Sequence, residues 1–396
     1  MESKLVDEHY FPRQYSEKLL MIDHGEGSCL FDAAGKKYLD FGSGIAVNAL
    51  GYGREDLAKI AYEQMKKVIH VSNLYTTEPA VILAAKLTAT GNFSAVHFGN
   101  SGSEANEAAL KYARLYAGKK AGSEKHKIAC FTNGFHGRTL GALSCTPKAK
   151  YQDPYKPLLP GVKVLPYNES DKLEQGLDGT FAGVIVEAVQ GEGGLTAIQP
   201  EFAQKLRELC TAHDIILIAD EVQTGCGRTG EFYASSWAGL NPDIITLSKP
   251  LAGGLPLSAT LIPDKINNLL SIGAHGTTFG GGPVTTAVAS YVLDQIFTPD
   301  FLSGIKEKGD FLKGELEQLT ESYGELTGIK GKGMLLGIEM SAEEKIPDIM
   351  NTARDNGLLI LRSGSNVLRF APPLIITREE ITEGIAVLDA VLRKLL

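Results

Sequence analysis

Apolar and polar positions follow two different periods along the chain between about residues 54 and 243. Strand-like apolar runs fall at 127–131, 182–186 and 215–219, and helical patterns at 104–117 and 201–212. In the last of these, Phe202, Leu206 and Leu209 form one apolar face, and Pro200 stands where a first-turn proline belongs. Such alternation predicts a mainly parallel sheet covered by helices.

The pattern changes after about residue 285. Helices are predicted near 283–296, 301–322 and 346–356, and strands near 334–340, 358–361 and 367–371. A last helix opens with the capping box Thr377-x-x-Glu380. We therefore expect an α/β fold with three parts: an N-terminal segment (1–50) that joins the small domain, a large domain (51–285), and a small α+β domain (286–396).

Two reactive side chains follow predicted strands. Asp220 comes directly after the strand 215–219, and Lys249 follows the apolar run 244–247, just before a tight turn at Gly253. In a parallel sheet, ligands collect at the carboxyl ends of strands. A lysine and a carboxylate there suit pyridoxal phosphate, because the lysine forms a Schiff base and the carboxylate keeps the ring nitrogen protonated.

A glycine loop, Ser101-Gly102-Ser103, runs into the predicted helix that begins near Glu104. Backbone N–H groups at a helix start, together with the helix dipole, favour a phosphate. The alternative is that Ser101-x-x-Glu104 is only the capping box of its own helix.

Four further residues, on predicted loops or strands, each have two possible roles. Phe135 could stack on a planar cofactor, or it could be a packing residue. Arg138 could hold a carboxylate through two parallel hydrogen bonds, or it could be a surface residue. Glu192 lies between glycines and is either a solvated loop charge or the ion-pair partner of an arginine. Arg369 is either inward-facing or exposed, since strand alternation places it opposite Leu368.

Composition narrows the class of protein. The 396 residues carry a formal net charge of −8 without a basic run, so nucleic acid and anionic membranes are not expected partners. No apolar run approaches the roughly 20 residues of a membrane span, and the N-terminus is too charged for a signal peptide. Five cysteines without a CxxC pair indicate a reducing compartment, and we expect the cytoplasm.

Other motifs fail their context. The GxGxxG at 225–230 neither follows a strand directly nor opens a clear helix, as a dinucleotide site requires. Walker A, HExxH and GxSxG motifs are absent from the sequence, and the eight histidines, His136 among them, show no metal-ligand spacing.

The motifs are more specific as a series than singly. They occur in the order NSGSEANEAALKYAR, FHGRTLGALS, VEAVQGEGG, IADEVQTGCGRTG, LSKPLAGGLP, HGTTFGGGP and LRFAPPL. From about residue 25 to residue 373 the chain resembles the class III (ω-amino acid) aminotransferases, which are pyridoxal-phosphate enzymes of fold type I. The resemblance implies a homodimer with shared active sites.

The resemblance also implies roles for the cofactor site. Lys249 would carry the cofactor and shuttle a proton, and Asp220 would face the ring nitrogen. Gln223 would face the ring hydroxyl, and Phe135 would stack on the ring. The phosphate would be held by Ser101, Gly102, Ser103 and Thr278 of the partner subunit.

For the substrate, the resemblance implies that Arg138 binds the α-carboxylate. Arg369 would pair with Glu192, opening for glutamate and closing for the amine donor. Tyr15 and Thr277 would contact substrate.

Within the family, the acetylornithine aminotransferases are the most similar branch. The implied reaction moves the distal amino group of N-acetyl-L-ornithine to 2-oxoglutarate, in arginine biosynthesis. Alternatives are ornithine, γ-aminobutyrate, succinylornithine or carrier-linked lysine as donor, a relative of the same fold that decarboxylates or isomerises its substrate, or a non-catalytic relative. Ala188 and Gly282 depart from the usual proline and asparagine, and Gly282 makes the substrate less certain.

Overall fold

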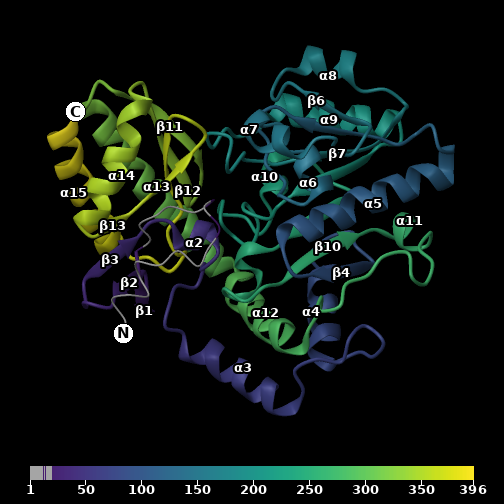
Figure 1. Cartoon of the computed structure of the whole chain (residues 1–396), viewed down its shortest axis with the longest axis horizontal. Coiled ribbons are helices and arrows are strands. Elements are labelled where there is room, and N and C mark those ends of the chain that lie inside the picture. The colour runs from purple at the N-terminus through teal and green to yellow at the C-terminus, as the bar shows by residue number, and fades with distance from the viewer. Residues whose placement is uncertain (1–11, 13, 15–19) are drawn as a thin grey trace.

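The computed structural model describes residues 12, 14 and 20–396, and Figure 1 shows two groups of elements side by side. The larger group contains a seven-stranded sheet. Its strands in spatial order are β4 (Ala95–Gly99), β10 (Ser258–Ile262), β9 (Ile244–Leu247), β8 (Ile216–Asp220), β7 (Phe181–Val186), β5 (Lys127–Phe131) and β6 (Val162–Leu165). Strands β9, β8, β7, β5 and β6 are parallel, which confirms the predicted mainly parallel sheet.

Strand β10 differs from its neighbours because it pairs antiparallel with both β4 and β9. The connection from β9 is short and contains the 3₁₀ helix Lys249–Ala252. A parallel pair needs a crossover of a dozen residues or more, so this chain can only turn back beside β9. The sequence pattern did not predict this reversal.

Helices cover both faces of the sheet. Helix α5 (Gly102–Ala121) packs on one face, and α8 (Ser170–Gly176) and α9 (Pro200–Ala212) pack on the other. The period of two along β8 divides its side chains accordingly: Ile216 and Ile218 join the core under α5, and Leu217 joins the core around Phe202. The sheet is thus buried on both faces, and ligands reach it only at its edges.

The remaining helices of this group lie around the sheet. They are α3 (Glu55–Lys67), α4 (Glu78–Thr88), α6 (Leu140–Ser144), α7 (Ala149–Gln152), α10 (Ala234–Ala238), α11 (Asp264–Asn267) and α12 (Pro283–Ile296). Helix α12 packs on α3 and α4 at the bottom of Figure 1.

The smaller group joins the two ends of the described chain. One sheet has the order β1 (Ile22–Glu26), β2 (Cys29–Asp32), β3 (Lys37–Asp40), β13 (Leu358–Leu359); the other has β11 (Leu326–Lys332), β12 (Leu335–Met340), β15 (Val367–Phe370), β14 (Leu361–Ser363). The helices are α2 (Ser43–Ala46), α13 (Pro299–Ser322), α14 (Ile346–Asp355) and α15 (Arg378–Leu395). Strand β3 pairs in parallel with β13, Leu39 opposite Leu358. The boundaries at residues 50 and 285 stay a prediction.

Local signals in this group act as expected. The capping box at Thr377 and Glu380 is formed at the start of α15, which confirms that prediction.

All five cysteines are buried and free. None of the helices in the described part of the chain is long and apolar enough to cross a membrane.

Candidate active site

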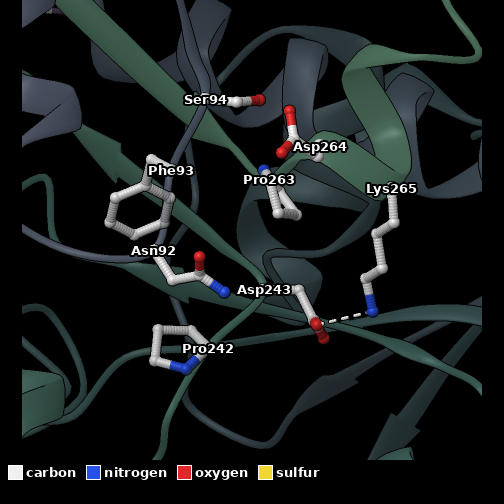
Figure 2. A pocket seen from close by; sticks show the side chains of 8 residues that line it. All are labelled: Asn92, Phe93, Ser94, Pro242, Asp243, Pro263, Asp264 and Lys265. Atoms are coloured by element: carbon white, nitrogen blue, oxygen red, sulfur yellow. Dashed lines mark ion pairs between the residues drawn. The ribbon is translucent and has the colours of Figure 1, made fainter.

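Two cavities lie at opposite ends of the strands of the large sheet. Only one of them contains a lysine that is left without an ion-pair partner among the described residues. Figure 2 shows the first, of about 400 Å³, in which Lys265 points to Asp243 at the start of β9. The Asp243 carboxylate accepts from Lys265 Nζ (2.7 Å), Arg207 Nη1 (3.1 Å) and the Leu217 N–H (2.9 Å). These partners satisfy the carboxylate, so this hollow is a structural ion-pair site.

The second hollow, of about 180 Å³, lies at the carboxyl ends of the parallel strands. It is lined by Ser101, Gly102, Ser103, Asn106, Phe135, His136, Gly137, Glu187, Asp220, Val222, Gln223, Ser248 and Lys249. The fold therefore gathers all of the predicted cofactor residues of one chain except Thr278, which belongs to the partner-subunit prediction. This is the edge where ligands bind in open α/β sheets.

Among the described residues that line this hollow, Lys249 alone carries an amine. It begins the 3₁₀ helix and is separated from the end of β9 by Ser248 alone, so the sheet fixes its backbone position. Burial above all, together with the charge of Arg369, lowers the pKa of Lys249 to about 8 against the opposing charges of Glu192, Asp220 and Glu187. About a tenth of such an amine is neutral at pH 7, enough to act as nucleophile or base.

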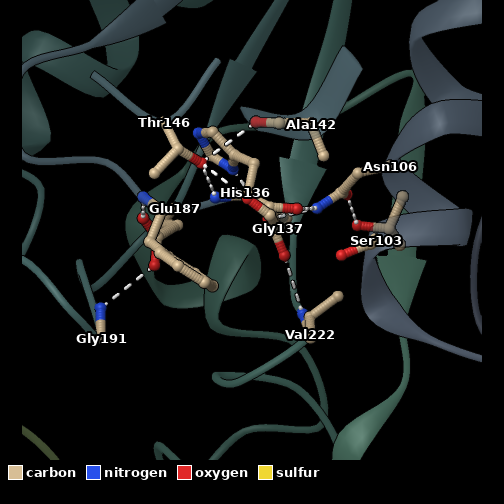
Figure 3. A network of polar contacts seen from close by, with 12 residues as sticks. Ser103, Asn106, His136, Gly137, Ala142, Thr146, Glu187, Gly191 and Val222 are labelled. Carbon is tan, nitrogen blue, oxygen red and sulfur yellow. Dashed lines mark hydrogen bonds and ion pairs between the residues drawn. The ribbon is translucent and has the colours of Figure 1, made fainter. Parts of the chain in front are cut away.

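Asp220 is the last residue of β8 and lies at the bottom of the hollow, 4% exposed. Its Oδ2 accepts from His136 Nδ1 (2.7 Å) and Asn106 Nδ2 (2.8 Å), and its Oδ1 accepts from the Val222 N–H (3.0 Å). Figure 3 shows the three donor residues, His136, Asn106 and Val222, within one network of polar contacts. Three donors hold the group in one orientation and compensate its burial.

For His136 the sequence favoured a satisfied or an exposed role over metal binding, but it did not predict the contact with Asp220. Burial lowers the pKa of its imidazole, but the hydrogen bond and charge of Asp220 outweigh burial and raise it overall. The ring is fully enclosed, and its backbone N–H donates to Thr146 Oγ1 (2.9 Å). It is thus a satisfied core histidine that orients Asp220; its position next to Phe135 was the available signal.

Glu187 is a second residue that sequence reasoning did not assign. It directly follows β7. Its two carboxylate oxygens accept from the Phe135 N–H (2.9 Å) and the Gly191 N–H (3.1 Å). Burial raises its pKa to about 7. Glu187 therefore joins the loop that carries Phe135 to the loop that carries Glu192, as Figure 3 shows for Gly191.

The start of α5 supplies a concave surface of backbone and hydroxyl donors. Ser101 caps the helix by accepting from the Glu104 N–H (3.3 Å), but the Glu104 carboxylate accepts from the Asn100 N–H (2.5 Å) and not from that of Ser101, so the predicted capping box is not formed. Ser101 also lines the hollow. A Cβ on Gly102 would lie 2.6 Å from Val222 Cγ1, so only glycine fits here. With the dipole of a 20-residue helix behind it, this surface suits a dianionic phosphate.

These features fit pyridoxal phosphate. The helix start matches its phosphate, Asp220 its ring nitrogen and Lys249 its aldehyde, while half-buried Phe135 and buried Gln223 line the space between.

Glu192 and Arg369 form an ion pair, as the resemblance implied. Arg369 is 3% exposed, and its Nη1 also donates to the Gly191 carbonyl (2.8 Å) and to Gln223 Oε1 (3.2 Å). Within the described residues its Nε has no partner. The inward-facing alternative for Arg369 is thus the one observed, because the 190–194 loop covers that face of β15.

Arg138 lies outside this pair, at a larger cavity of about 430 Å³. That cavity is lined by Gln14, Arg138, Leu143, Tyr151 and Tyr155. The described lining residues include no carboxylate, and Arg138 has no ion-pair partner in the described part of the chain. Its guanidinium is therefore free to bind an acid.

Two predicted residues, Thr277 and Thr278, do not line these cavities. Thr277 accepts from Asn100 Nδ2 (3.2 Å) through its hydroxyl and from Asn73 Nδ2 (2.8 Å) through its carbonyl. Thr278 is exposed on the surface. Tyr15 lies outside the described residues.

Comparisons with known proteins agree with this geometry. The sequence model of the family described as aminotransferase class-III matches residues 10–392. The probable mitochondrial acetylornithine aminotransferase of Dictyostelium discoideum is 44% identical over 95% of this chain and 84% of its own length. The acetylornithine aminotransferase of Vibrio parahaemolyticus is 42% identical over 98% of this chain and 97% of its own.

Solved structures with the same fold include two aminotransferases. The ornithine aminotransferase of Toxoplasma gondii has a TM-score of 0.94 at 28% identity, covering 99% of this chain and 94% of that one. The N-acetylornithine aminotransferase of Stenotrophomonas maltophilia has a TM-score of 0.84 at 32% identity, covering 98% and 97%.

Proposed function

The chain belongs to the class III aminotransferases, which are pyridoxal-phosphate-dependent transaminases, and we propose that its amino donor is N-acetyl-L-ornithine. The amino group would pass to 2-oxoglutarate, giving N-acetyl-L-glutamate 5-semialdehyde and L-glutamate. Such a reaction serves the biosynthesis of arginine. The names of the relatives in Dictyostelium and Vibrio support this donor.

The composition of the cavity beside Arg138 carries the choice of donor. A carboxylate bound by Arg138 leaves the α-nitrogen of the substrate in the same cavity. The described lining has two tyrosines, a leucine and a glutamine, and Lys148 lies close by. A free α-ammonium would find no counter-ion among the described lining residues, whereas a neutral N-acetyl amide costs much less to bury than a charge.

Each group at the cofactor site has a distinct task in this proposal. When bound, pyridoxal phosphate supplies an aldehyde that takes up the amino group and a ring that withdraws electrons. Ser101, Gly102 and Ser103 would bind its phosphate, and Phe135 would pack against its ring. Asp220 keeps the proton on the ring nitrogen. The Lys249 amine takes a proton from the carbon that carries the transferred nitrogen and returns it one position away.

The Glu192–Arg369 pair adapts the same site to two substrates. N-acetylornithine has one carboxylate, which Arg138 binds, so the pair stays closed. 2-Oxoglutarate has two, so the second needs Arg369 and displaces Glu192. Both states keep Arg369 neutralised, which matters because a buried unpaired charge costs several kcal/mol.

The donor is tested by mixing cofactor-loaded protein with single amines in the absence of a keto acid. N-acetylornithine is expected to bleach the visible absorbance of the bound cofactor at least about tenfold faster than ornithine does, since ornithine buries an unpaired ammonium. γ-Aminobutyrate, N-succinylornithine and lysine complete the series. Faster bleaching by one of the other amines would contradict the proposed donor and leave the transaminase chemistry intact.

We also propose that the active form is a homodimer. One surface region exposes a group of large apolar side chains, named here the apolar patch: Ile69 (58% exposed), Leu74 (86%), Tyr75 (74%) and Phe279 (67%). Phe279 lies against His70, with ring centroids 5.4 Å apart, so the patch is continuous and adjoins Thr278. Exposed apolar surface of this kind marks protein interfaces.

In the dimer, Thr278 of the partner subunit would complete the phosphate site. Replacing Thr278 with alanine is expected to weaken cofactor binding about tenfold, the typical effect of losing a hydrogen bond to a charged group. The dissociation constant for pyridoxal phosphate and the sedimentation mass check this together. A monomeric wild-type protein, or unchanged cofactor affinity in the variant, would argue against the shared site.

The cytoplasm is the proposed location. Its support is that all five cysteines are free thiols, which a reducing compartment maintains.

A further inference from the structure

Arg138 is an exposed arginine on a loop, without an acidic partner among the described residues. Its backbone is fixed, because its N–H donates to Ser103 Oγ (3.2 Å). Its side chain has several rotatable bonds, and an unsupported guanidinium would lose that freedom on binding a carboxylate. A contact that restricts the guanidinium before the substrate binds would reduce this loss of conformational entropy and so strengthen binding.

Tyr151 provides that restriction. The Cζ of Arg138 lies 3.6 Å from the centroid of the Tyr151 ring and 5.6 Å from that of Phe135. A guanidinium stacked by its face on an aromatic ring keeps its N–H groups free in its own plane. Those N–H groups remain available for the two parallel hydrogen bonds that a carboxylate accepts.

The ring of Tyr151 is itself well anchored. It lies on α7, whose Gln152 side chain donates to the Leu143 carbonyl (2.9 Å) at the end of α6. The Tyr151 N–H donates to the Lys148 carbonyl (2.8 Å), which closes the turn. In the described part of the chain, the Tyr151 hydroxyl makes no hydrogen bond to another residue, so the aromatic ring is the part of the side chain in use.

Lys148 connects the same ring to the Glu192 loop. Its Nζ donates to the Glu192 carbonyl (2.5 Å) and lies 5.8 Å from the Tyr151 centroid. One aromatic ring thus lies close to two cations, Arg138 and Lys148, and neither cation has a carboxylate partner among the described residues. This arrangement stabilises positive charge at the cavity without introducing an acid that would repel a carboxylate.

We propose that Tyr151 is a positioning residue that holds the Arg138 guanidinium ready for the carboxylate of the donor. The inference rests on the proposed function, in which Arg138 binds that carboxylate. Tyr151 acts through Arg138 and leaves the reacting carbon alone. It therefore sets the affinity for carboxylated donors and not the rate of proton transfer.

The test compares Tyr151→Leu and Tyr151→Phe with two donors. One is N-acetylornithine, and the other is N-acetyl-1,4-diaminobutane, the same molecule without its carboxylate. Tyr151→Leu is expected to raise KM for N-acetylornithine about tenfold with kcat changed less than about twofold, and to leave kcat/KM for the other donor within about twofold. Tyr151→Phe keeps the ring and should match the wild type.

A double-mutant cycle with Arg138→Leu completes the test. If Tyr151 acts only through Arg138, adding Tyr151→Leu to Arg138→Leu changes nothing further. Additive losses, equal losses on both donors, or no loss in Tyr151→Leu would each overturn the proposal. Cofactor absorbance and Tm of every variant show that it is folded.

Failure of the proposed function gives a different result. In that case the wild type itself shows no preference for N-acetylornithine over N-acetyl-1,4-diaminobutane, and the roles of Arg138 and Tyr151 fall together.

Discussion

Replacing Lys249 with alanine is expected to lower kcat by about 10⁴-fold, because it removes both the covalent anchor of the cofactor and the base that moves the proton. The variant can still hold the cofactor through the helix start and Asp220. The two half-reactions, followed by the visible absorbance of the cofactor, measure the loss. Lys265→Ala, at the opposite edge of the sheet, is the matched control and should leave kcat unchanged.

Two further results belong to this prediction. Ethylamine added to Lys249→Ala is expected to restore part of the rate, since a small amine can occupy the space left by the side chain. In the wild type, cofactor uptake should become faster as pH rises through about 8, where the Lys249 amine loses its proton. Near-normal turnover in Lys249→Ala would refute the assignment of the base.

The Asp220→Asn variant is expected to lose about 10²- to 10³-fold in kcat, the usual effect of removing a pre-organised charge from a buried site. An amide cannot keep the ring nitrogen protonated by its charge. It also leaves His136 without the carboxylate that raises its imidazole pKa. The pH profile of the variant should therefore differ from that of the wild type, in addition to the lower rate.

Asp264→Asn gives the control for this substitution, because Asp264 is exposed at the opposite edge. Retention of cofactor absorbance and Tm in Asp220→Asn separates loss of chemistry from loss of folding. If Asp220→Asn turns over at the wild-type rate with a full complement of cofactor, Asp220 does not act on the ring nitrogen.

The positions of Asp220 and Lys249 could be predicted because each directly follows an apolar run. Side-chain period and strand length are local properties, so the sequence showed which strand ends carry chemistry. The fold class followed from the same pattern. The strand β10 could not be predicted, because its direction depends on the length of the connection after Lys249 and not on its own residues.

The supporting residues were harder to predict than the reactive ones. His136, Glu187 and Tyr151 act through contacts with residues that lie far away in the sequence or on another loop. Their types carry no distinguishing spacing, and a buried histidine or a loop tyrosine usually has only a packing role. Arg369 shows the same limit: alternation placed it opposite Leu368, but only the 190–194 loop decides that its face is covered.

The pairing of β3 with β13 has a consequence for synthesis of the chain. Leu39 and Leu358, which lie opposite each other in these strands, are 319 positions apart in the sequence (358 − 39). At about 5–20 residues per second, a ribosome needs roughly 16 to 64 seconds to make the partner strand after β3 has emerged. During that time the edge of β3 stays open to pairing with other nascent chains. Cells that make this protein rapidly therefore depend on whatever shields that edge until the last 40 or so residues arrive.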